Sequence, residues 1–202
     1  MQAGRSPHLM NQVLYGETFF ALLQHVDVKY FPVEDEMRII IVGCGKVGRT
    51  ITEQLSLEGN DITVIDKKST VVHDVTNNYD VMGVVGNGAS HLVQKEAGIE
   101  EADLLIAVTE SDELNLLCCL IAKKAGDCST IARVRNPMYS NEVNFIKEEL
   151  GLSMTINPEC AAATEIARIL RFPSAIKIDT FAKGRVELLK FKIEEGSMLD
   201  AA

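Results

Sequence analysis

Positive charge is in short supply in this sequence. Lysines and arginines number 20 against 29 aspartates and glutamates, which gives a formal net charge of −9. A protein that holds DNA or RNA by its backbone needs a basic face that neutralises phosphates. The charge balance therefore argues against nucleic acid as a partner.

Long hydrophobic runs are also missing. No apolar stretch of the sequence approaches the roughly 20 residues that cross a bilayer as a helix. No segment has the charged, apolar and small-residue regions of a secretory leader. We therefore predict no direct membrane insertion, and any link to a membrane has to pass through a partner.

Cysteine patterns typical of zinc sites or of a disulfide framework are absent. The five cysteines show no CxxC spacing, have no histidine pair nearby and lie mostly within apolar runs. We expect them to be reduced core residues of a cytosolic protein. They are Cys44, Cys118, Cys119, Cys128 and Cys160.

The chain is uneven from end to end. Residues 1–36 carry several aromatic side chains and then an acidic patch, and Met37 follows directly before a strand-like run, as a natural start would. We expect residues 1–36 to be an appended leader or a fused segment of a binding partner. A native amphipathic extension is the alternative.

From Met37 onward, apolar strand-like runs alternate with helical stripes. One stripe is formed by Val47, Ile51 and Leu55. Alternating strands and helices with short connections predict an α/β fold with a doubly wound, mostly parallel, Rossmann-like sheet over residues 37–156. The predicted strands lie at 38–43, 61–66, 81–86, 103–109, 130–135 and 153–157.

A glycine motif follows the first predicted strand and opens the first helix. Gly43, Gly45 and Gly48 give G-x-G-x-x-G in the context that dinucleotide binding requires. Gly43 permits the tight turn, Gly45 lets a pyrophosphate approach the backbone, and Gly48 lets the helix pack on the sheet. The helix N-terminus then favours an anion. A tight turn without a ligand is the alternative reading.

Asp66 ends the second predicted strand, 23 residues after Gly43. A carboxylate there can accept the hydroxyls of an adenosine ribose and repel a 2′-phosphate, although Lys67 and Lys68 weaken the repulsion. We therefore predict NAD(H) in preference to NADP(H), with ATP or ADP as alternatives because they share the unphosphorylated ribose. The other interpretation of Asp66 is a helix N-cap.

Three later loops fall at the carboxyl ends of predicted strands, where ligands of doubly wound sheets bind. Gly86 and Gly88 would flank an adenine or ribose, and Thr109 and Asp112 either contact the ligand or cap the following helix. Further on, Arg133 and Arg135 share one face of a strand. We interpret these two arginines as a phosphate contact or a subunit interface.

Five stretches, taken in order, carry a resemblance. "MRIIIVGCGKVGRTITEQL", "NDITVID", "VVGNGAS", "EADLLIAVTESDELNLLCC" and "IARVRNPMY" are similar to the RCK, or KTN, nucleotide-binding domain of TrkA-type potassium uptake proteins. The resemblance implies a cytoplasmic regulatory subunit, peripheral at the inner face of the cell membrane. It also implies a homodimer or higher oligomer that binds NAD(H) or ATP/ADP and gates a Trk- or Ktr-type membrane potassium transporter.

The resemblance also implies a set of ligand contacts at Gly43, Gly45, Lys46, Val47, Asp66, Asn87, Thr109 and Arg133. With the residues derived from the pattern alone, the predicted binding site adds Gly48, Lys67, Gly86, Gly88 and Asp112. We predict neither a metal site nor catalytic residues.

Beyond the sheet, residues 157–172 predict a helix with Asn157 as N-cap and an apolar stripe that includes Ile166. The resemblance makes this a crossover helix and dimer hinge. If the leader is a segment of a binding partner, we expect it to dock on this helix through Phe19, Phe20 and Leu23. An ordinary helix covering its own sheet is the alternative. Residues 173–202 predict two strands and the start of a small C-terminal α+β subdomain that is truncated.

Two enzyme functions compete with the regulatory one. An NAD(H)-dependent oxidoreductase without its substrate domain, or a sirohaem-type biosynthetic enzyme, would share the glycine motif. A dehydrogenase also needs a proton-transfer residue near the nicotinamide. His8 and His25 lie in the leader, and His73 and His91 lie on helix patterns, so the regulatory function is favoured.

Overall fold

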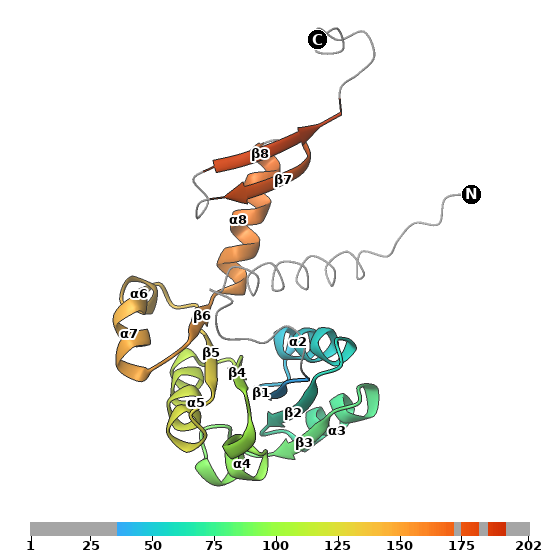
Figure 1. The fold of residues 1–202 in the computed structure, drawn as a ribbon, viewed down its shortest axis with the longest axis vertical. Helices are drawn as coiled ribbons and strands as arrows, with labels where there is room; N and C mark the ends of the chain where they lie inside the picture. Colours follow the sequence, from blue (N-terminus) through green and yellow to red (C-terminus); the bar gives the residue numbers. More distant parts are fainter. Residues whose placement is uncertain (1–35, 172–174, 182–185, 193–202) are drawn as a thin grey trace, which may run out of the picture. The chain divides into compact units, whose positions relative to one another are not determined.

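A computed structural model describes residues 36–171, 175–181 and 186–192 (Figure 1). By their internal contacts the residues fall into two units, 1–159 and 160–202. The predicted leader, its proposed docking residues and the turn between the last two strands lie outside the described residues.

The first unit is built on a parallel sheet of six strands in the order β3-β2-β1-β4-β5-β6. This order confirms the doubly wound, Rossmann-like prediction. The strands are β1 (Arg38–Val42), β2 (Asp61–Asp66), β3 (Met82–Val85), β4 (Leu104–Ala107), β5 (Ser129–Arg133) and β6 (Met154–Ile156).

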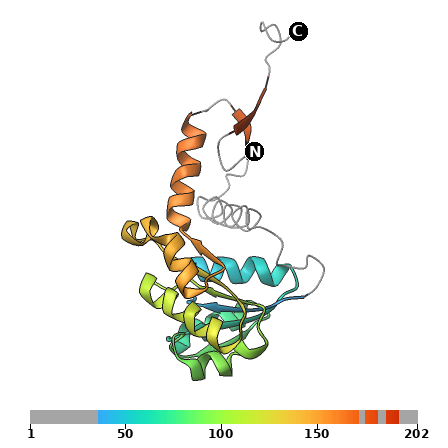
Figure 2. The ribbon, with the colours of Figure 1, turned by 60° about the vertical axis from the view of Figure 1, so that its left-hand side comes forward.

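Helices cover both faces of the sheet (Figure 2). Side chains of α2 and α3 pack against one face of the sheet, and those of α4, α5 and α7 pack against the other. The apolar run of β4 is buried at all four positions, as a strand covered on both faces must be. Among the described residues, the helices of this unit are α2 (Lys46–Leu57), α3 (Ser69–Asn78), α4 (His91–Glu96), the 3-10 turn η2 (Ile99–Glu101), α5 (Asp112–Ala125), α6 (Pro137–Asn141) and α7 (Val143–Leu150).

The strand register aligns the predicted site residues along one edge of the sheet. Val42 of β1 pairs with Ile65 of β2 on one side and with Ala107 of β4 on the other. Ala107 in turn pairs with Ala132 of β5. The residues that follow these positions, Gly43, Asp66, Val108 and Arg133, therefore form one row at the carboxyl ends of four adjacent strands.

The helix α8 (Pro158–Arg171) has Pro158 at its first position, where proline has no hydrogen bond to lose. Pro158 is its buried residue, while Ile166, Ile169 and Leu170 are largely exposed. In the second unit, β7 (Ala175–Phe181) and β8 (Val186–Phe191) form an antiparallel pair.

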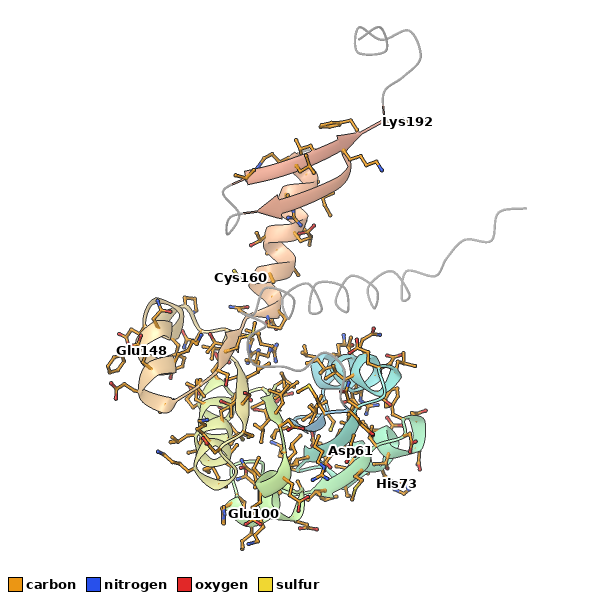
Figure 3. The ribbon with its side chains drawn as sticks, viewed as in Figure 1. Asp61, His73, Glu100, Glu148, Cys160 and Lys192 are labelled. Carbon is orange, nitrogen blue, oxygen red and sulfur yellow. The ribbon has the colours of Figure 1, made fainter. Side chains whose placement is uncertain are left out.

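The prediction that all five cysteines are core residues is wrong at one position. Cys44, Cys118, Cys119 and Cys128 are buried, whereas Cys160 is exposed on α8 (Figure 3). Three alanines follow Cys160 in the sequence, but the helix that they form does not bury this position in the single chain.

Candidate functional site

The three glycines of the motif differ in their surroundings. Gly43 has a positive φ of 98°, and a Cβ there would lie 2.9 Å from the backbone nitrogen of Thr109. A Cβ on Gly48 would lie 1.8 Å from the carbonyl oxygen of Gly43. A Cβ on Gly45 would meet no atom beyond its chain neighbours within 4 Å. Gly43 and Gly48 therefore shape the turn, and Gly45 faces open space.

The N-terminus of α2 has no anion of its own. Gly45 occupies the N-cap position without a side-chain hydrogen bond, and the first turn, which begins with Lys46 and Val47, contains no acidic residue. The first N–H groups of a helix lack intrahelical partners and carry partial positive charge. This end of α2 is suited to an anionic ligand that approaches across Gly45.

Asp66 is half-buried beside this loop. Its Oδ2 accepts a hydrogen bond from the backbone N–H of Cys44 at 2.9 Å, and its Oδ1 accepts one from that of Lys68 at 2.9 Å. Lys68 is itself the N-cap residue of α3, and this helix has no side-chain cap hydrogen bond, so the alternative reading of Asp66 as an N-cap is wrong. An ionised carboxylate has about four acceptor sites, which leaves room for ribose hydroxyls. The neighbouring Lys67 is exposed.

Cys44, between the first two glycines, is 2 % exposed. Burial, and secondarily the carboxylate of Asp66, raise the pKa of its thiol to about 12, against a smaller lowering by Arg49. The thiol is therefore protonated at neutral pH and is a poor nucleophile, since the thiolate is the reactive form. Its role is to fill the core beneath the loop.

The loop after β3 places Asn87 at the surface between two packed glycines. A Cβ on Gly86 would meet Val93 at 2.6 Å, and one on Gly88 would meet Val42 at 2.2 Å. The Asn87 side chain accepts a hydrogen bond from the N–H of Ala89, which closes a local turn. Asn87 is therefore the exposed side chain between the two packed glycines of this loop.

Two buried amides that the sequence reasoning missed hold these loops. Gln94 is fully buried, and its Nε2 donates to the carbonyls of Gly88 at 2.7 Å and Cys118 at 2.9 Å. Asn115 is also fully buried, and its Oδ1 accepts from the N–H of Thr109 at 2.8 Å. The available signal was a polar residue inside an apolar helical run, because buried amides need partners.

Asn115 also connects two neighbouring strand ends. Its Oδ1 accepts from the hydroxyl of Thr109 at 2.7 Å, and its Nδ2 donates to the carbonyl of Arg133 at 2.9 Å. Thr109 and Arg133, both predicted as ligand contacts, are thus held together by one side chain. Thr109 is only partly exposed, so a ligand would reach one side of it.

The carboxylate of Asp112 is 6 % exposed and already has donors. Its Oδ2 accepts from the backbone N–H groups of Arg135 at 2.8 Å and Asn136 at 2.7 Å, and its Oδ1 is 3.4 Å from Nε of Arg135. In this structure Asp112 therefore fixes the turn between β5 and α6. Its predicted contact with a ligand stays a prediction.

The two arginines that were predicted to share one face of a strand differ in environment. β5 ends at Arg133 and Arg135 lies beyond it, so the prediction is wrong for Arg135. Arg133 is 9 % exposed; its Nη1 lies 3.4 Å from the carbonyl of Thr109, and its Nη2 pairs with Glu159. Arg135 is exposed and also donates to the carbonyl of Glu110. Of the two, Arg133 is the buried cation on the row of site residues.

The predicted site residues are therefore brought to one edge of the sheet, around α2 and the loops that follow β3, β4 and β5. In the described ranges no cluster of three or more His, Cys, Asp or Glu side chains is arranged to hold a metal ion. Among the same residues, no helix is long and apolar enough to span a bilayer.

Comparison with known proteins gives the family. Residues 39–158 match the family model described as the TrkA-N domain. The chain belongs to the TrkA-N family. A TrkA homolog of the Trk potassium uptake system from Archaeoglobus fulgidus is 38 % identical over 164 residues, which cover 81 % of this chain and 37 % of that protein. The chain spans little more than a third of the length of the curated relatives that it matches.

Solved structures share this fold. The crystal structure of the TrkA-N domain of the Escherichia coli inner membrane protein ybaL is 26 % identical, with a TM-score of 0.59, and the match covers 68 % of this chain and 99 % of that one. A structure described as the GsuK channel bound to NAD has a TM-score of 0.55 at 16 % identity, over 88 % of this chain and 32 % of that one. The latter supports the fold alone.

Proposed function

We propose that this TrkA-N domain binds an adenine nucleotide at the carboxyl edge of its sheet. NAD(H) is the first candidate, and ATP or ADP are the alternatives. The observation that carries the proposal is the open space at Gly45, in front of a helix N-terminus that lacks both a cap and an acidic residue. The pyrophosphate would accept hydrogen bonds from the N–H groups there.

The neighbouring residues would hold the rest of the nucleotide. Asp66 would accept the ribose hydroxyls, with Lys67 beside it. Asn87 and its two flanking glycines would border the adenine. Thr109 and Arg133 would face the part of the ligand beyond the pyrophosphate.

The function served by this binding is regulatory. The curated relatives are named as potassium uptake proteins rather than as enzymes. His73 and His91 are both exposed, on α3 and at the start of α4 (Figure 3 labels His73). We infer a cytoplasmic subunit at the inner membrane face that modulates a Trk- or Ktr-type potassium transporter according to its bound nucleotide.

A second copy of the chain is the proposed cover for α8. Ile166, Ile169 and Leu170 are 55 %, 47 % and 72 % exposed in the single chain, and burying such side chains is favourable by about 1.5–3 kcal/mol each. We propose that α8 forms the dimer hinge and that residues 157–172 separate the nucleotide-binding domain from a small C-terminal subdomain. Sedimentation of the chain as a monomer at micromolar concentration would contradict the dimer.

Calorimetric titration tests the binding proposal directly. Wild-type chain should bind NADH with a stoichiometry of about one per chain and bind NADPH more weakly, because Asp66 repels a 2′-phosphate. Absorbance at the nicotinamide band should stay constant, since no turnover is expected. Equal affinity for the two cofactors would contradict the role of Asp66, and oxidation of NADH would favour the oxidoreductase alternative.

A further inference from the structure

Arg133 is a cation almost enclosed by protein. Its side chain is 11 % exposed, and its buried Nε has no hydrogen-bond partner among the described residues. Its contact with the carbonyl of Thr109 is long, at 3.4 Å. A buried guanidinium with unmet hydrogen-bonding capacity depends on a nearby anion.

The anion that it has is Glu159. One carboxylate oxygen of Glu159 pairs with Nη2 of Arg133, and the Glu159 side chain is 48 % exposed. Asp112, the other carboxylate close to this strand end, already accepts hydrogen bonds from the backbone N–H groups of Arg135 and Asn136. The Arg133–Glu159 pair therefore joins the last residue of β5 to the first turn of α8.

The position of Arg133 relates it to the glycine loop. Val42, Ala107 and Ala132 are register partners on β1, β4 and β5, and Gly43 and Arg133 follow the first and last of them. Since adjacent strands lie about 4.8 Å apart, Arg133 is roughly 10 Å from the loop along the edge of the sheet. A nucleotide whose pyrophosphate sits at Gly45 would direct its next chemical group toward Arg133.

That next group differs between the candidate ligands. In ATP it is a further phosphate, whereas in NADH it is an uncharged nicotinamide riboside. We propose that Arg133 is a specificity determinant, for which Glu159 and the terminal phosphate of a nucleoside triphosphate compete. The inference rests on the proposed nucleotide binding and deepens it.

Breaking the ion pair affects Glu159 and Arg133 differently. Glu159 is half-exposed, so its carboxylate regains water when it is released. Arg133 stays enclosed and has to keep an anion, which the phosphate supplies. ATP therefore releases the first turn of α8 from β5, and NADH leaves it tied. A ligand shifts a conformational equilibrium only through such a difference in interaction between states.

Replacing Glu159 by Gln tests the competition. Calorimetry of the full chain with ATP and with NADH, in EDTA so that no divalent cation bridges the ligand, gives the affinities. Glu159→Gln should tighten ATP binding roughly five- to tenfold, the scale of one partly exposed ion pair, and leave NADH within about twofold. Glu165→Gln is the matched control, because it breaks the Arg168 pair on the same helix. It should change neither affinity.

A second pair of variants, made with Arg133 replaced by Gln, distinguishes loss of the ion pair from the loss of one negative charge near the ligand. When Arg133 is already replaced by Gln, Glu159→Gln should no longer tighten ATP binding. A gain that persists in that background would overturn the proposal, as would unchanged ATP affinity in Glu159→Gln. Weaker ATP binding would also overturn it, since Glu159 would then help to hold the ligand. Absence of any nucleotide binding by wild type would remove the proposed function as well.

Discussion

The two helices that follow the central strands begin in opposite ways. At the start of α5 the hydroxyl of Ser111 accepts a hydrogen bond from the N–H of Leu114 at 3.1 Å, and Asp112 and Glu113 occupy the first turn. At the start of α2 there is no side-chain cap and no acid, and Gly45 faces open space.

The difference separates structural from functional helix ends. Both helix N-termini lie at the same edge of one parallel sheet, and both present N–H groups without intrahelical partners. At α5 the chain itself supplies a partner, Ser111, for the N–H of Leu114 and places two acidic residues in the first turn. It leaves the N–H groups for an outside anion at α2, which is the position where doubly wound sheets bind phosphates.

The largest expected effect contrasts two glycines of one loop. Gly48→Ala should lower the free energy of unfolding by about 2–3 kcal/mol, because the new Cβ would overlap the Gly43 carbonyl, 1.8 Å away. Gly45→Val should fold with a stability within about 1 kcal/mol of wild type, because nothing lies within 4 Å.

Thermal unfolding with and without NADH measures both effects. Wild type should gain stability with ligand, and Gly45→Val should not, because the valine would fill the space where the pyrophosphate meets the backbone. A ligand-induced shift that survives in Gly45→Val would place the nucleotide elsewhere.

The next largest effect is a loss of NADH affinity, which compares carboxylates at the two ends of β2. Asp66→Ala should weaken NADH binding about tenfold or more, the value of a charge-assisted hydrogen bond, and narrow the gap between NADH and NADPH. Asp61→Ala removes an exposed carboxylate at the opposite end of β2 and is the matched control. Comparable losses in the two variants, measured by calorimetry, would point to net charge rather than to a ribose contact.

A smaller effect is expected at the capped helix. Ser111→Ala should lower the free energy of unfolding by about 1 kcal/mol through loss of the N-cap, measured by urea denaturation. NADH affinity should stay within about twofold of wild type. A large loss of affinity would mean that the start of α5 is also part of the ligand site.

The smallest effect concerns pH at the same helix. The backbone N–H of Glu113 and the hydroxyls of Ser111 and Tyr139 donate to the Glu113 carboxylate and lower its pKa. A carboxyl group whose pKa is lower in the folded than in the unfolded state stabilises the fold at pH values above its unfolded-state pKa. That stabilisation is lost as the pH falls through the folded-state pKa. Tyr139→Phe should therefore be slightly less stable than wild type near neutral pH and equal to it in acid. A melting-temperature difference that is independent of pH would exclude this contact as the cause.

Much of the fold was predictable because its strands are short, strongly apolar and bounded by turn residues. The six predicted strands match β1 to β6, and the buried run of β4 carried the clearest signal for a parallel sheet. Cys160 was misjudged because sequence neighbours do not reveal whether another element covers a helix. The one-turn helices α4 and α6 have too few residues for a periodic signal.

The location of the site was predictable from the sequence, but the separate role of each residue in it was not. Spacing alone identified the glycines, yet only the fold reveals that Gly48 abuts a backbone carbonyl and Gly45 does not. The tie from Asn115 to Thr109 and Arg133 depends on tertiary contacts between neighbouring strand ends. A sequence pattern does not specify such contacts between side chains and backbone.

The central claim is that the N-terminus of α2, and not that of α5, receives the anion. Backbone amide NMR of the chain during titration with NADH tests it most directly. The account predicts large downfield shifts of the amide protons of Gly45, Lys46 and Val47 and small changes at Asp112–Leu114. Shifts confined to the first turn of α5, or no change at Gly45 at saturating ligand, would contradict it.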